Sequence, residues 1–169
     1  KRVLIFLCFI FLIIGCGKSQ ESNIEIIQKE LKPLNIEISD RLVSIYLPSN
    51  YLETQIDYPV IYMNDGDGIF TTDYSWQMDS TMEKFVESGE KEPAIIVGIH
   101  NSPKRNSEYV PWDWYDTIDG VNREGLGKEY IEFIINEVKP YIDSNYRSLT
   151  GSETTCIGGS SLGGLISIY

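Results

Sequence analysis

Residues 154 to 166 read TTCIGGSSLGGLI, and they carry the strongest fold signal in the chain. Residues 154 to 158 form a short apolar run that predicts a buried strand, and Leu165 and Ile166 begin an apolar helix. Residues 159 to 163, GSSLG, match the pattern G-x-S-x-G, in which a serine occupies a sharp turn from a strand into a helix. The stretch therefore predicts a strand, a tight turn and a helix, with Ser161 at the turn as a candidate nucleophile.

A glycine-rich turn with only a structural role is the alternative interpretation. A five-residue pattern occurs often by chance, but the requirement for a strand before it and a helix after it removes most accidental matches. The glycines have a physical purpose, because side chains two positions either side of Ser161 would collide with the neighbouring strand and helix. Ser160 lies one position early for the pattern, and we expect it to pack.

Two further runs, at residues 58 to 63 and 94 to 99, are short and nearly continuously apolar, like the predicted strand before Ser161. Nearly continuous apolar runs are typical of strands buried on both faces of a parallel sheet. Apolar residues at helical spacing separate the three runs, between positions 78 and 86 and between positions 126 and 142. The second helix is expected to kink at Pro140. This alternation predicts a doubly wound parallel sheet with helices on both faces.

The residues before position 58 follow a different pattern. Residues 24 to 31 and 42 to 47 carry apolar side chains, in part, at every second position, which is typical of half-buried antiparallel strands. The predicted element order is β-β-β-α-β-α-β-α. We therefore expect an α/β protein of the α/β-hydrolase class, with antiparallel strands at its start and the chain truncated after the serine turn.

A nucleophilic serine requires hydrogen-bond donors for the negative charge that develops on its substrate. In the predicted fold, one donor is the backbone N–H after the nucleophile, which belongs to Leu162. The other comes from the loop after the third strand, here residues 64 to 68, NDGDG. A plain β-turn and a calcium loop are the alternatives for these residues, but the spacing of the aspartates departs from the EF-hand pattern. We expect no metal and no organic cofactor.

The chain resembles the esterase family that includes enterochelin esterase, esterase D and the mycolyltransferases. The resemblance implies a carboxylic-ester hydrolase that acts through an acyl-enzyme on Ser161, with the backbone N–H groups of Leu162 and Asp67 as oxyanion donors. It also implies a small-molecule ester substrate, such as a siderophore or carbohydrate ester. An acyltransferase and a surface-binding lipoprotein without catalysis are the alternatives. The matching stretches are residues 62 to 70, 96 to 99, 108 to 112, 138 to 143, 146 to 147 and 158 to 165.

The chain departs from this family in its catalytic partners. The acid and the histidine of the triad follow the serine in this fold, whereas the one histidine of the chain, His100, precedes Ser161. We therefore expect the acid and the base to be missing from this chain, which alone would be nearly inactive and would expose a sheet edge. His100, Trp112 and Gly66 are expected to line the substrate pocket.

The first residues have the layout of an export signal. Two basic residues precede an apolar run at residues 3 to 14, which is too short to span a membrane and ends before Cys16. Residues 13 to 16 resemble a lipobox, so we expect a lipoprotein signal peptide at 1–15, a lipidated Cys16 with a tether at 16–23, and the esterase domain at 24–169. The protein would then be exported and lipid-anchored in a bacterial cell envelope. An ordinary secretory signal is the alternative.

Charge and cysteine content argue against a nucleic-acid partner and against a disulfide. The 25 acidic and 14 basic residues give a net charge of -11, which argues against a nucleic-acid partner. Of the three cysteines, Cys8 would leave with the signal and Cys16 would carry lipid. Cys156 would remain alone, so we expect no disulfide.

Overall fold

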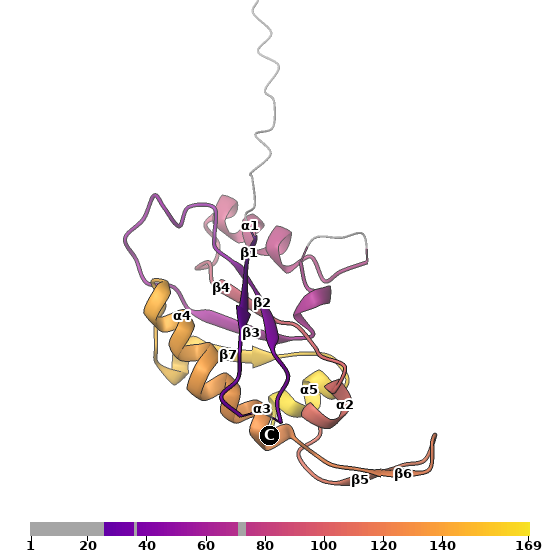
Figure 1. The fold of residues 1–169 in the computed structure, drawn as a ribbon. Coiled ribbons are helices and arrows are strands. Elements are labelled where there is room, and N and C mark those ends of the chain that lie inside the picture. Colours follow the sequence, from indigo (N-terminus) through magenta and orange to yellow (C-terminus); the bar gives the residue numbers. More distant parts are fainter. Residues whose placement is uncertain (1–25, 36, 71–73) are drawn as a thin grey trace, which may run out of the picture.

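The computed structural model describes residues 26 to 35, 37 to 70 and 74 to 169 (Figure 1). The predicted signal peptide, Cys16 and the tether lie outside the described residues. In the part of the chain that is described, no helix is both long enough and apolar enough to cross a membrane.

A sheet in the order β1-β2-β4-β3-β7 forms the centre of the molecule (Figure 1). The strands are β1 (Ile26–Leu31), β2 (Arg41–Tyr46), β3 (Val60–Asn64), β4 (Ile95–Ile99) and β7 (Thr155–Gly158). β2 pairs antiparallel with β1 and β4, whereas β3 pairs parallel with β4 and β7. The predicted α/β-hydrolase arrangement, with antiparallel strands followed by a parallel sheet, is confirmed.

Helices cover both faces of this sheet, as predicted. On one face, Ile95, Val97 and Ile99 of β4 pack in one apolar cluster with α3 (Gly127–Phe133) and α4 (Lys139–Asn145). On the other face, Ile96 packs with Met82 of α1 (Met78–Ser88). All five residues of β4 are buried, which explains its continuous apolar sequence.

The long helical segment is irregular before Pro140 rather than at it. A π-helical turn, η2 (Ile134–Val138), joins α3 to α4, and Pro140 lies in the first turn of α4. Proline has no N–H and so cannot bond to the carbonyl four residues earlier, which falls inside η2. The irregularity that the sequence predicts at Pro140 is therefore taken up by the preceding turn.

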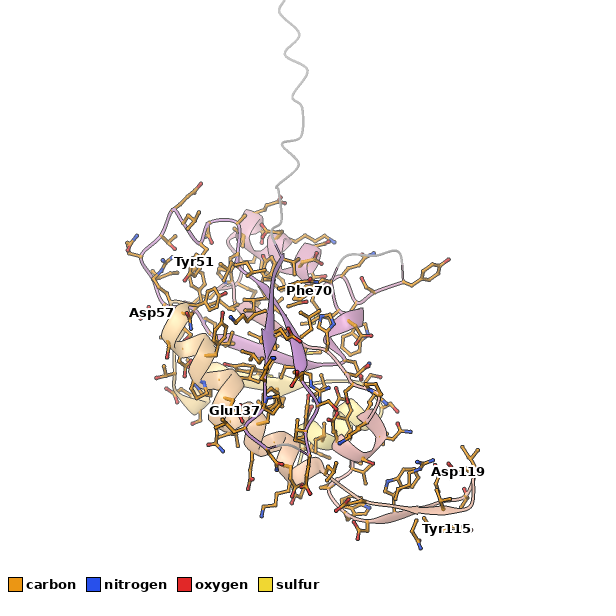
Figure 2. The ribbon with its side chains drawn as sticks, in the orientation of Figure 1. Tyr51, Asp57, Phe70, Tyr115, Asp119 and Glu137 are labelled. Carbon is orange, nitrogen blue, oxygen red and sulfur yellow. The ribbon has the colours of Figure 1, made fainter. Side chains whose placement is uncertain are left out.

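Several short elements are absent from the predicted order. They are η1 (Gly66–Gly68), α2 (Arg105–Glu108), η3 (Ser152–Thr154) and a hairpin of β5 (Trp114–Asp116) and β6 (Val121–Arg123). Elements of three or four residues are too short to show a hydrophobic period. The hairpin projects from the body of the molecule, and Figure 2 shows Tyr115 and Asp119 on it.

β7 lies at the edge of the sheet in the described part of the chain, with β3 as its neighbour. An apolar groove of about 210 Å³ lies beside it, between the sheet and the helices. Its lining includes Tyr62, Ile131, Ile135, Ile157 and Ile166. The expected exposed edge is therefore present in the structure. The prediction that this strand is buried is wrong, because β7 lies at the edge of the described sheet and none of its residues is buried.

Candidate active site

Ser161 occupies the turn between β7 and α5 (Leu162–Ser167). Its backbone has φ 55° and ψ -124°, a conformation that is uncommon for a residue with a side chain. The residue is exposed, and the turn lies beyond the carboxyl end of a parallel strand. Ligands in open α/β sheets bind at this edge, so Ser161 lies where its hydroxyl could reach a bound substrate.

The glycines of the turn hold the strand end against the helix start. A Cβ on Gly159 would lie 2.7 Å from the carbonyl carbon of Gly163, so neither segment leaves room for a larger residue. Gly163 in turn lies close to the loop after β3, because a Cβ there would be 3.0 Å from Asp65 Oδ2. The predicted steric reason for these glycines is confirmed. The expectation that Ser160 packs is wrong, because this residue is exposed.

The loop after β3 has a bend at Asp65, which has φ 57° and ψ 44°. Gly66 is buried, and a Cβ on it would lie 2.2 Å from the carbonyl carbon of Gly98 in β4. Gly66 therefore supports the loop from beneath and does not present a surface to a ligand. Asp67, whose N–H is the predicted second oxyanion donor, is exposed.

A set of hydrogen bonds that the sequence did not predict holds this loop in place. Arg105 of α2 donates from Nε to Asp65 Oδ1 at 2.6 Å and from Nη2 to Asp65 Oδ2 at 2.7 Å. Asn101 donates to one carboxylate oxygen of Asp65 and to one of Asp67. The N–H of Asp65 donates to the hydroxyl of Tyr109, 3.1 Å away. The four-residue spacing of Arg105 and Tyr109 on a helical turn is the sequence signal for this arrangement.

His100 follows the carboxyl end of β4, and its side chain forms a hydrogen bond with a residue of β2. Its Nε2 lies 2.7 Å from the hydroxyl oxygen of Ser44. Burial lowers the pKa of His100, while the negative charge of Asp67 acts in the opposite direction. The imidazole is therefore biased toward its neutral form.

Trp112 remains a candidate for substrate contact because 55% of its surface is exposed. It lies in the segment that leads to the hairpin, and a Cβ on Gly127 would contact both Pro111 and Ile166 of α5. The start of α3 is thus in close contact with Pro111 and with the helix that follows Ser161. Tyr109, by contrast, is completely buried and offers no aromatic surface.

No group of three or more His, Cys, Asp or Glu side chains among the described residues is arranged to hold a metal ion.

Comparison with known proteins gives a family match. The model of the family described as "Putative esterase" matches residues 38–169. The curated protein "Uncharacterized protein YbbA" of Bacillus subtilis (strain 168) is 27% identical over 131 residues, which are 77% of this chain and 50% of that protein. The chain thus spans about half the length of this relative.

Solved structures are similar over most of the chain. An IroE-like serine hydrolase from Shewanella oneidensis is 27% identical, with a TM-score of 0.67 over 84% of this chain and 44% of that one. The enterobactin esterase FES from Shigella flexneri is 16% identical, with a TM-score of 0.64 over 87% and 33%. A ferulic acid esterase from Anaeromyces mucronatus is 21% identical, with a TM-score of 0.55 over 86% and 52%.

Proposed function

The chain belongs to the esterase family whose model matches residues 38–169, and from this premise we propose that the protein hydrolyses carboxylic esters through an acyl-enzyme on Ser161. One observation carries the proposal. Ser161 is exposed at positive φ on the turn between β7 and α5, and this turn contacts the loop after β3. A strained, exposed serine between a parallel strand and a helix is the geometry of a nucleophile elbow.

In the proposed reaction, the hydroxyl oxygen of Ser161 attacks the ester carbonyl carbon while a general base takes its proton. The carbonyl oxygen becomes an anion that accepts hydrogen bonds from the backbone N–H groups of Leu162 and Asp67. Both residues stand in the first turn of a helical element, where N–H groups have no partner within the helix. The alcohol leaves with a proton, and water then hydrolyses the acyl-enzyme.

The base and its acid are proposed to lie outside these 169 residues. His100 is the one histidine here, and its Nε2 is hydrogen-bonded to Ser44. Serine without a base is a poor nucleophile, so the complete protein must supply one.

We propose a small-molecule ester, such as a siderophore or carbohydrate ester, as the substrate. Two similar structures are an enterobactin esterase and a ferulic acid esterase. The exposed Trp112 supplies an apolar surface that suits an aromatic or sugar group.

The export proposal rests on the sequence of residues 1 to 16. Lipid on Cys16 would anchor the protein to a bacterial envelope membrane. Cys16→Ser is expected to abolish metabolic labelling with a fatty-acid analogue. Equal labelling of the Cys16→Ser variant would contradict the anchor.

The function is tested on the full-length protein with a fluorophosphonate probe and p-nitrophenyl acetate. The unmodified protein should be labelled and should turn over the ester, whereas Ser161→Ala should lose labelling and at least about a thousandfold in kcat. Ser160→Ala is the matched control, because this exposed neighbour should keep both activities. Failure of the unmodified protein to react would favour a surface-binding protein, and acyl transfer to added alcohols would identify an acyltransferase.

A further inference from the structure

We propose that Asn64 is a positioning residue that sets the spacing between the two backbone donors of the oxyanion hole, an inference that rests on the proposed function. Asn64 is the last residue of β3 and only 1% of it is exposed. The loop that carries Asp67 begins directly after it. Its side chain crosses to α5, whose first residue, Leu162, carries the other donor.

Two hydrogen bonds make this crossing. Asn64 Nδ2 donates to the carbonyl oxygen of Gly163 at 3.0 Å and to the hydroxyl oxygen of Ser167 at 3.0 Å. Gly163 is adjacent to Leu162 in the chain, so the first bond ties the helix start to the end of β3. The two donor segments are therefore joined by an amide that is shielded from solvent.

The orientation of this amide is fully determined by its partners. A carbonyl oxygen can only accept, so the nitrogen of Asn64 must face Gly163. The hydroxyl of Ser167 donates its own proton to Gly163 at 2.6 Å, which leaves its lone pairs for Asn64. Asn64 Oδ1 then accepts from the hydroxyl of Tyr130 at 2.7 Å. Each polar atom of the amide has a partner.

Tyr130 holds the amide from the opposite side. It belongs to α3 and is completely buried, and burial raises its pKa well above the ordinary value. The phenol therefore keeps its proton at neutral pH and can donate to Asn64. Its ring packs against the ring of Tyr109, with centroids 5.0 Å apart, and beneath the guanidinium group of Arg41.

A positioning role and a purely structural role have different kinetic consequences. Oxyanion donors act over a narrow range of distance, and a displacement of about 1 Å can lower the rate about a hundredfold. A displaced donor weakens the transition state more than the bound substrate, so kcat should fall while KM changes little. A purely structural amide would instead lower the unfolding temperature and leave the kcat of the folded molecules unchanged.

The test uses Asn64→Leu and Tyr130→Phe in the full-length protein. Asn64→Leu preserves the size of the side chain without its hydrogen bonds, and kcat should fall about a hundredfold. Tyr130→Phe removes the hydroxyl that donates to Asn64 Oδ1 and keeps the ring, so a fall of about tenfold is expected, and this milder variant serves if Asn64→Leu fails to fold. KM should stay within about twofold in both.

Tyr62→Phe is the matched control. Tyr62 lies two residues before Asn64 in the same strand, is 2% exposed, and its hydroxyl has no hydrogen-bond partner among the described residues. The control should keep both kcat and KM.

Lower unfolding temperatures with unchanged kcat in both variants would overturn the inference, as would a rise in KM alone. Labelling by the fluorophosphonate probe separates this outcome from failure of the proposed function. If the unmodified protein reacts and Ser161→Ala does not, the proposed function stands. The kinetics of the variants then test only the positioning role of Asn64. If the unmodified protein does not react, the function itself fails.

Discussion

At the residue scale, single close approaches determine the shape of the site. Gly66 lies so near Gly98 that a methyl group on Gly66 would overlap the backbone of β4. The loop after β3 can rest on β4 because Gly66 lacks a side chain. Gly68, two residues further along the same loop, has open space where its Cβ would be.

This difference predicts opposite outcomes for two similar substitutions. Gly66→Ala should lower the free energy of unfolding by about 1 to 3 kcal/mol, because a methyl group forces the loop away from β4. Gly68→Ala should leave it nearly unchanged. Urea denaturation of the two variants measures the difference, and equal stabilities would contradict the packing described here.

His100 makes stability depend on pH. Burial lowers its pKa below the ordinary value of 6.5, so the unfolded chain binds a proton at a pH at which the folded chain does not. The contribution of His100 is complete above about pH 6.5 and is lost as the pH falls toward the folded-state pKa. The unfolding temperature should therefore fall more between pH 7 and pH 5 in the unmodified protein than in His100→Gln. Parallel pH profiles for the two proteins would contradict this.

At the element scale, a buried ion pair joins α2 to β2. Arg41 Nη2 lies 2.7 Å from Glu108 Oε2, and both side chains are fully buried. The pair is a charge contact rather than a well-aligned hydrogen bond, because no partner among the described residues meets hydrogen-bond geometry at Nη2. Glu108 also accepts from Ser39 and Ser102, and Arg41 donates to the carbonyl oxygen of His100. These contacts hold α2 in place, and α2 in turn carries Arg105, which binds Asp65 in the loop after β3.

Glu108→Gln should therefore destabilise the protein strongly. The substitution leaves the charge of Arg41 buried without its counter-ion, which typically costs about 3 to 5 kcal/mol. Glu132→Gln is the control, because its i,i+4 pair with Lys128 is exposed and should contribute less than about 0.5 kcal/mol. Chemical denaturation compares the two variants, and a similar small effect for both would show that the buried pair is not needed.

At the scale of the whole molecule, the sheet brings together segments that are far apart in the chain. The parallel strands β3, β4 and β7 end at the same edge, so the loop after β3, the segment after β4 and the turn after β7 meet there (Figure 1). Helices on both faces bury β3 and β4, and Ser161 at that edge is exposed. The site is therefore a product of strand order as much as of its residues.

Residue patterns alone predicted the three parallel strands, the antiparallel start, the longer helices and the turn at Ser161. Each of these has a local signal, since apolar period and glycine spacing act over a few neighbouring residues. The strand order, the short elements, the bond of His100 to Ser44 and the bond of Asn64 to Gly163 became visible only in the folded structure. Those partners are 56 and 99 residues apart, and no local pattern records which distant segments a folded sheet will bring into contact.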